Sequence, residues 1–296
     1  PDQLPDLAWS TDIAGHISAR AARETGLAQG TPVTAGTIDA AAEALSVGVL
    51  QPGDMMMMYG STVFTIMLTQ HRLQDERLWY APWLFKGQHA SMAGLATSGT
   101  LTHWFRDQFA RDMDGEGAFA ALAGEAAHSP EGAKGLVFLP YFSGERTPIH
   151  DSNAKGVIFG LNLTHGRGDI YRALLEGIAC GTAHIIDTYR EIKEPPLAIY
   201  AVGGGTRNNV WAQATSDISG VQQFLRREMI GASYGDAFLA ALSVNDVALK
   251  DIVKWNPSTS SIRARGEHAA AYSRQYGVFR RLYDQTRGLM AALSAQ

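Results

Sequence analysis

Short apolar segments alternate with helical patterns along most of this chain, and glycines stand at many of the junctions. Residues 32–36 predict a strand, and the alanine-rich segment 40–45 that follows predicts a helix. Residues 197–202 predict another strand, which ends in the three glycines 203–205 before a helical pattern over 210–218. Strands and helices that mix in this way are typical of the α/β and α+β fold classes.

A hairpin with a glycine-bearing tip is expected within this alternation. Two apolar runs, 55–59 and 63–68, are joined through Gly60-Ser61-Thr62. Other segments predict further strands and helices by their hydrophobic spacing. The strands are expected at 78–84, 89–93, 135–141 and 221–225, and the helices at 11–27, 100–109, 169–192, from Gly235 onward and at 268–293.

Composition and charge exclude several classes of protein. The chain has 296 residues, 46% of them hydrophobic and 18% charged, which describes an ordered globular protein of one large or two modest domains. A formal net charge of −4 offers no basic field to nucleic acid or to an anionic membrane, and no apolar run approaches the roughly 18 residues of a membrane span. The single cysteine, Cys180, forms no intramolecular disulfide, which suits a cytoplasmic protein.

Signature motifs of other enzyme classes are absent or incomplete. The sequence contains no Gly-Lys dipeptide for a phosphate-binding P-loop and no His-Glu-x-x-His for zinc. The turn Gly203-Gly204-Gly205 precedes a helix, but Asn208 stands where the dinucleotide fingerprint has its third glycine. This turn could belong to a Rossmann oxidoreductase, to a plain helix entry or to another phosphate or nucleotide cradle.

A short segment also fits the nucleophile turn of serine hydrolases. Residues 231–235 have the pattern Gly-x-Ser-x-Gly with Ser233 at its centre, and a helix is expected after it. Aspartates and then His268 follow in the chain order that such a catalytic triad requires. A serine hydrolase and a helix that merely starts with small residues are the two interpretations.

Asp39 stands between a predicted strand and a predicted helix, and two interpretations apply to it. The carboxylate could cap the helix by accepting its first backbone N–H groups. It could also act as a general base, because a carboxylate at a helix N-terminus stays ionised near neutral pH and can accept a proton from a substrate hydroxyl. Similarly, Gly60 and Ser61 could form an ordinary turn or present backbone N–H groups to a phosphate.

The order of these features resembles that of the FGGY family of carbohydrate kinases. The series consists of Asp39, the Gly60-Ser61 tip, Gly99 in Ser98-Gly99-Thr100, and the glycines 203–205. A long block over residues 139–177, which contains Gly144-Glu145-Arg146-Thr147-Pro148, is similar to the C-terminal signature of the family and to its xylulokinase-like branch. The resemblance covers essentially the whole chain, but only the later part of a family member.

The resemblance implies a fold, a division into domains and a set of site residues. The fold would be the ribonuclease-H-like, actin/hexokinase-type ATPase fold, a mixed sheet flanked by helices. Residues 1–51 would be the tail of a sugar-binding domain I that is otherwise missing, and 52–296 the nucleotide-binding domain II. Asp39 would be the general base and a sugar ligand. The residues on the nucleotide side would be Gly60, Ser61, Gly99, Gly203, Gly204, Gly205 and Asn208.

The implied activity is transfer of the γ-phosphoryl group of ATP to a hydroxyl of a pentulose or related polyol. Mg²⁺ would accompany ATP, with its contacts mainly from the missing domain I and from water. Family members are often dimeric, so a homodimer is expected. Without domain I, the alternative is a non-catalytic ATP-binding fragment, and residues 1–51 would expose apolar surface and be poorly ordered or covered by a partner.

Overall fold

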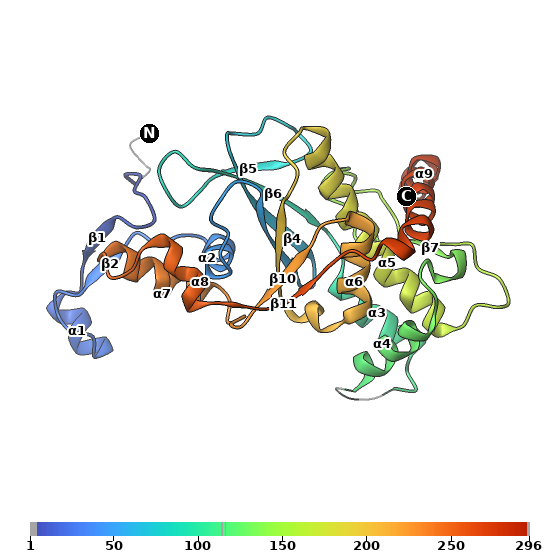
Figure 1. The fold of residues 1–296 in the computed structure, drawn as a ribbon, viewed down its shortest axis with the longest axis horizontal. Coiled ribbons are helices and arrows are strands. Elements are labelled where there is room, and N and C mark those ends of the chain that lie inside the picture. The colour runs from blue at the N-terminus through green and yellow to red at the C-terminus, as the bar shows by residue number, and fades with distance from the viewer. Residues whose placement is uncertain (1–4, 114, 116, 295–296) are drawn as a thin grey trace.

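The computed structural model describes residues 5–294 except 114 and 116. A central sheet of seven strands runs in the order β11-β10-β9-β3-β4-β6-β5, and two smaller sheets pair β1 with β2 and β7 with β8 (Figure 1). The strands are β1 (Ile13–His16), β2 (Pro32–Thr34), β3 (Asp54–Tyr59), β4 (Val63–Thr69), β5 (Trp79–Pro82), β6 (His89–Leu95), β7 (Val137–Leu139), β8 (Val157–Phe159), β9 (Ala198–Val202), β10 (Gln223–Arg226) and β11 (Ser258–Ile262).

Helices cover both faces of the central sheet. The helices of the described chain are α1 (Ala19–Thr25), which lies away from the sheet, α2 (Asp39–Ser46), α3 (Gly99–Phe109), α4 (Ala118–His128), α5 (Arg167–Glu191), α6 (Asn209–Ser219), α7 (Ala232–Ser243), α8 (Ile252–Trp255) and α9 (Ala269–Ser294). Met55 and Met57 on β3 pack into the core shared with α3, α5 and α6, whereas Met56 packs toward α2 and α7. Since successive side chains of a strand point to opposite faces, a strand buried on both faces is largely apolar, as β3 is after its first residue, Asp54.

The register of the sheet brings two glycine turns to one edge. Strand β3 runs antiparallel to β4, so the predicted hairpin is confirmed, with Met55 opposite Met67. Strand β3 runs parallel to β9, with Met58 opposite Val202. Because parallel strands end at the same edge, the turn after β3 at Gly60 meets the turn after β9 at residues 203–205.

The N-terminal segment differs from the expected helix over 11–27. It begins with strand β1, paired with β2, and helix α1 starts only at Ala19. The physical reason is the cap: the hydroxyl of Ser18 accepts a hydrogen bond from the Ala21 N–H, and Gly26 ends the helix in the left-handed conformation.

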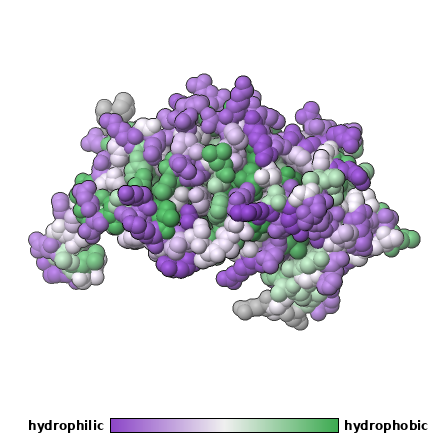
Figure 2. Space-filling view, viewed as in Figure 1, coloured by the Kyte–Doolittle hydropathy of each residue, from purple (hydrophilic) through white to green (hydrophobic). Residues whose placement is uncertain are grey.

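This segment lies outside the core. None of residues 5–40 is buried. Leu7 is fully exposed, and Ile38 and Leu27 are 57% and 53% exposed. Hydrophobic surface is visible at the end of the molecule that carries β1, β2, α2 and α7 (Figure 2). The expectation of poor order or a covering partner stays a prediction; residues 1–4 of the segment lie outside the described part of the chain.

Candidate nucleotide site

The Gly60-Ser61 turn is joined to the start of α3 by a ladder of hydrogen bonds. The Gly60 carbonyl oxygen accepts from the Gly99 N–H and from the Ser98 hydroxyl, both at 3.0 Å, and the Ser61 carbonyl oxygen accepts from the Thr100 N–H at 3.2 Å. A Cβ atom on Gly99 would lie 2.4 Å from the Gly60 carbonyl oxygen. Only glycine therefore allows the two backbone segments to approach so closely.

The second turn has glycines with different tasks. Gly203 has a φ of +90°, and a Cβ atom there would lie 2.7 Å from the Tyr59 carbonyl oxygen. A Cβ atom on Gly205 would lie 2.4 Å from the Trp211 ring. At Gly204, by contrast, no heavy atom of the described residues comes within 4 Å of such a position. Gly203 and Gly205 thus allow close packing, whereas Gly204 borders open space.

Both turns open on one cavity of about 510 Å³, a volume that suits a small-molecule or cofactor site. The cavity is bordered by the ends of β3 and β9 and by helices α3, α4, α5 and α6. Six of the residues expected on the nucleotide side line it: Gly60, Ser61, Gly99, Gly204, Gly205 and Asn208. The seventh, Gly203, is not part of the lining and instead shapes the turn.

Aromatic side chains form much of the remaining wall, and no motif indicates Tyr59, His103, Phe119 or Tyr171 among them. The Tyr59 and Trp211 rings meet edge to face with centroids 4.8 Å apart, and His103 meets Phe119 at the same distance. Tyr171 of α5 also borders the cavity. The Trp211 Nε1 atom is buried and has no hydrogen-bond partner among the described residues. Tyr59, Trp211 and Tyr171 are buried, so only the accessible rings of His103 and Phe119 can stack on a planar ring system.

Asn208 caps helix α6 while it faces the cavity. Its Oδ1 atom accepts a hydrogen bond from the Trp211 N–H at 3.2 Å, in the geometry of an N-cap residue. The cap fixes the first turn of α6, including Trp211, against the two glycine turns. The helix N-terminus also gives this wall a partial positive charge.

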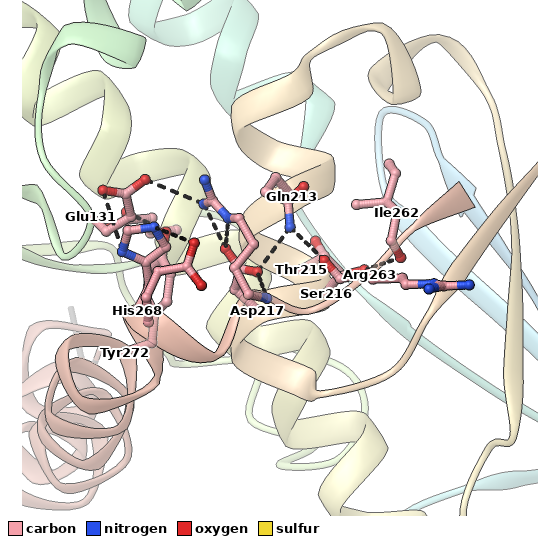
Figure 3. A network of polar contacts seen from close by, with 12 residues as sticks. Glu131, Gln213, Thr215, Ser216, Asp217, Ile262, Arg263, His268 and Tyr272 are labelled. Carbon is pink, nitrogen blue, oxygen red and sulfur yellow. Dashed lines mark hydrogen bonds and ion pairs between the residues drawn. The ribbon is translucent and has the colours of Figure 1, made fainter. Parts of the chain in front are cut away.

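Farther along, α6 is anchored by a polar network (Figure 3). The fully buried Asp217 carboxylate accepts hydrogen bonds from the Arg265 guanidinium at 2.7 and 3.0 Å and from the Gln213 amide at 2.8 Å. Arg265 also reaches Glu131 at 3.3 Å, and His268 lies 3.7 Å from the other oxygen of that carboxylate. The network ties α6 to the segment before α9 and so fixes the helix that walls the cavity.

Asp39 is the first residue of α2 and lies apart from the cavity lining. Its carboxylate is exposed, and its Oδ1 atom accepts only a short-range bond from the Ala40 N–H at 2.7 Å. The N-cap position belongs to Ile38, whose side chain cannot cap, so the capping interpretation of Asp39 does not hold. One turn later, burial and then the negative charge of Asp39 raise the pKa of Glu43. The structure thus leaves the Asp39 carboxylate available to a substrate.

The parts of the serine-hydrolase triad are not assembled. Ser233 is an exposed residue in the first turn of α7, whereas His268 contacts Glu131 and Glu267. The helix α9 that follows His268 lies toward the opposite end of the molecule from α7 (Figure 1). Among the described residues, no hydrogen bond joins the Ser233 hydroxyl to a histidine or carboxylate, which favours the interpretation as an ordinary helix start.

Glu145 clamps the connection between β6 and α3. Its Oε1 atom accepts hydrogen bonds from the Ala96 N–H at 2.6 Å and the Arg146 N–H at 2.7 Å, and Oε2 is buried without a partner among the described residues. Burial raises the pKa of this carboxyl to about 7, although these hydrogen bonds favour the charged form. The clamp therefore holds the strand end that leads to Gly99.

We expect Glu145 to make the stability depend on pH. The pKa of Glu145 is higher in the folded chain than its ordinary 4.5, so the folded chain holds this proton more tightly than the unfolded chain does. The protonated carboxyl therefore adds to the free energy of unfolding in full below pH 4.5, and this contribution is lost as pH rises through about 7. Glu145→Gln keeps the acceptor oxygen and removes this ionisation. Between pH 5 and pH 8, the free energy of unfolding of the wild type should fall by about 2.5 kcal/mol relative to the variant, measured by urea denaturation. A difference that stays constant with pH would contradict the assignment.

Membrane spans and metal clusters are both absent from the described residues. No helix there has the length and hydropathy of a membrane-spanning segment. No group of three or more His, Cys, Asp or Glu side chains in that part of the chain is placed to hold a metal ion.

Solved structures of sugar kinases share this fold. The xylulose kinase from Rhodospirillum rubrum superposes with a TM-score of 0.91 and 32% identity, over 98% of this chain and 59% of that one. The glycerol kinase of Plasmodium falciparum, solved with ADP, gives a TM-score of 0.82 at 20% identity, over 93% of this chain and 55% of that one. The mixed sheet flanked by helices is therefore the actin/hexokinase-like ATPase fold.

The sequence comparisons define the family more closely. Residues 55–244 match the C-terminal domain of the FGGY family of carbohydrate kinases. The xylulose kinase of Escherichia coli (strain K12) is 32% identical over 295 residues, which cover 98% of this chain and 60% of that enzyme. The chain belongs to the FGGY family of carbohydrate kinases, and it spans about 60% of the length of these relatives.

Proposed function

We propose that this chain is the nucleotide-binding part of an ATP-dependent sugar kinase of the xylulokinase-like branch, which phosphorylates a hydroxyl of a pentulose or related polyol. The observation that carries the proposal is that the glycine turns after β3 and β9 open on the same cavity, which has a volume of about 510 Å³. The similarity to xylulose kinases supports the class of substrate, and the similarity to the Plasmodium glycerol kinase, which was solved with ADP, supports the nucleotide.

The two sides of the cavity suit different parts of ATP. The Gly60 N–H already donates to the Thr62 carbonyl oxygen at 3.1 Å. Gly60 would therefore let the phosphates come close to the backbone, and the N–H and hydroxyl of Ser61 would donate to them. The aromatic wall around Trp211 and Phe119 would face the adenine. Mg²⁺ would be held by phosphate oxygens, water and domain I, because the described residues hold no group of metal ligands.

Asp39 would take the proton of the attacking sugar hydroxyl as the γ-phosphoryl group moves. Its exposed carboxylate at the start of α2 fits a base that faces a cleft. Residues 1–51 would then be the end of domain I and 52–296 domain II. The exposed apolar side chains of Leu7, Leu27 and Ile38 support a larger domain on this side.

Filling the cavity tests the nucleotide site. Gly204→Leu would add a side chain whose Cβ atom meets no described heavy atom within 4 Å, and we expect it to raise the Kd for ATP at least about tenfold in isothermal titration calorimetry. Gly277→Leu on α9, also with open space around it, is the matched control and should leave the Kd unchanged. Equal ATP affinity in both variants, or no ATP binding by the wild type, would refute the nucleotide site.

The catalytic part of the proposal needs a separate test. A polypeptide that includes domain I should phosphorylate a pentulose when a panel of ketoses and polyols is assayed with ATP. Binding of ATP without phosphorylation of any panel member would favour the alternative of a non-catalytic nucleotide-binding module.

A further inference from the structure

A second cavity, of about 240 Å³, lies where α5 and α9 meet the loop after β7. It shares no lining residue with the nucleotide cavity. Helix α9 also lies at the end of the molecule away from α2 and α7 (Figure 1). This cavity is therefore separate from the proposed nucleotide and sugar sites.

Two arginines of α9 face this cavity. Arg280 and Arg287 are seven residues apart, which places them on the same face of the helix. Arg280 donates a hydrogen bond to the Tyr276 hydroxyl at 3.2 Å, and neither arginine forms an ion pair with any residue that the structure describes. Two guanidinium groups at one cavity without bound carboxylates make a strong site for an oxyanion, because their N–H groups match its geometry.

Nearby carboxylates offset this charge only in part. Asp284 is the acidic residue of the lining and is exposed, so one carboxylate stands against two guanidinium groups. Asp151 accepts a hydrogen bond from the Tyr283 hydroxyl at 2.8 Å. Asp187 is bound by Tyr276 at 2.7 Å and by Arg190 at 2.9 Å. Arg190 balances the charge of Asp187, whereas Asp151 keeps its negative charge, because a tyrosine hydroxyl is neutral. The residues of the lining themselves carry two positive charges and one negative charge.

The remaining wall supplies a neutral donor and apolar surface. Burial, and then the positive charges of Arg280 and Arg77, lower the pKa of His184 to about 3, so its imidazole is neutral near pH 7 and can donate one N–H. The Tyr141 ring and the Ile149 side chain complete the wall. The volume exceeds that of a single phosphate, which leaves room for a small organic group beside these two residues.

We propose that this cavity binds a phosphate dianion, either free or as a small phosphate monoester, through Arg280, Arg287 and the His184 imidazole. The proposal does not depend on the identity of the sugar or on turnover.

Calorimetry with two probes at fixed ionic strength tests the site. Inorganic phosphate and ribose 5-phosphate should both bind the wild-type chain, and Arg287→Gln should raise both Kd values at least about tenfold. Arg281→Gln, an exposed neighbour outside the lining, should leave them within about twofold. Tighter binding of ribose 5-phosphate identifies a monoester as the ligand, and equal binding identifies free phosphate.

A local signal separates this site from phosphate bound at the Ser61 turn. Phosphate should raise the pKa of His184 in the wild type, because a nearby anion favours the imidazolium, and this shift should be lost in Arg287→Gln. The measurement is the pH titration of the imidazole resonances by NMR. The proposal fails if phosphate leaves the His184 titration unchanged, or if Arg281→Gln weakens binding as much as Arg287→Gln.

Discussion

Asp39→Asn is expected to lower kcat for sugar phosphorylation by about 10²–10⁴-fold, in a polypeptide that includes domain I. Asparagine keeps the oxygen that accepts the Ala40 N–H, so helix α2 should start as before. It cannot take the proton of the attacking hydroxyl, which is the loss that the rate reports. ATP affinity should be unchanged, because Asp39 lies outside the lining of the nucleotide cavity.

Ser233→Ala is the matched control for this prediction. Ser233 is exposed in the first turn of α7 and contributes nothing to the proposed phosphoryl transfer, so kcat should stay within about twofold of the wild type. The serine-hydrolase alternative predicts the reverse, namely loss of ester hydrolysis in Ser233→Ala and none in Asp39→Asn. A kinase whose rate survives Asp39→Asn would remove Asp39 from the role of general base.

The core elements of the fold could be predicted from local patterns. Apolar runs indicate the hairpin 55–68 and the strand before Gly203, and long helical spacing indicates α5. The helix expected over 11–27 was wrong in its first half, because pairing of β1 with β2 outweighs a weak helical pattern. Strand β11, which is mostly serine and threonine, carries no apolar signal and is fixed by pairing with β10 and by a hydrogen bond from the Ser216 hydroxyl of α6 to the Ile262 carbonyl oxygen.

The site could be predicted only where its residues lie in a motif. Gly99 and Asn208 were expected on the nucleotide side, and both line the cavity. Tyr171 belongs to the predicted helix 169–192, whose spacing indicates only a core face, whereas Phe119 belongs to α4, where no helix was predicted. What makes both of them cavity walls is the packing of α4 and α5 beside the two turns. Gly203 differs from both: it belongs to the motif and was expected on the nucleotide side, but it does not line the cavity and only allows the conformation of the turn.

The placement of α2, and with it Asp39, depends on one close helix contact. Gly235 of α7 faces α2, and a Cβ atom there would lie 1.8 Å from the Ala42 carbonyl oxygen. Since that atom is backbone, the two helices must separate to admit a methyl group. The start of α2, which holds Asp39, would move with them.

Gly235→Ala should therefore lower the free energy of unfolding by about 3 kcal/mol, measured by urea denaturation. Gly277→Ala is the matched control, because this glycine is also helical but has no heavy atom of the described residues within 4 Å of a Cβ position. There the added methyl group should stabilise the chain by about 0.5–1 kcal/mol, through helix propensity alone. Changes of opposite sign in the free energy of unfolding would show that the loss of stability in Gly235→Ala comes from the α2–α7 contact and not from glycine replacement as such. The same sign and size at both would mean that the helices are not packed as closely as the structure has them.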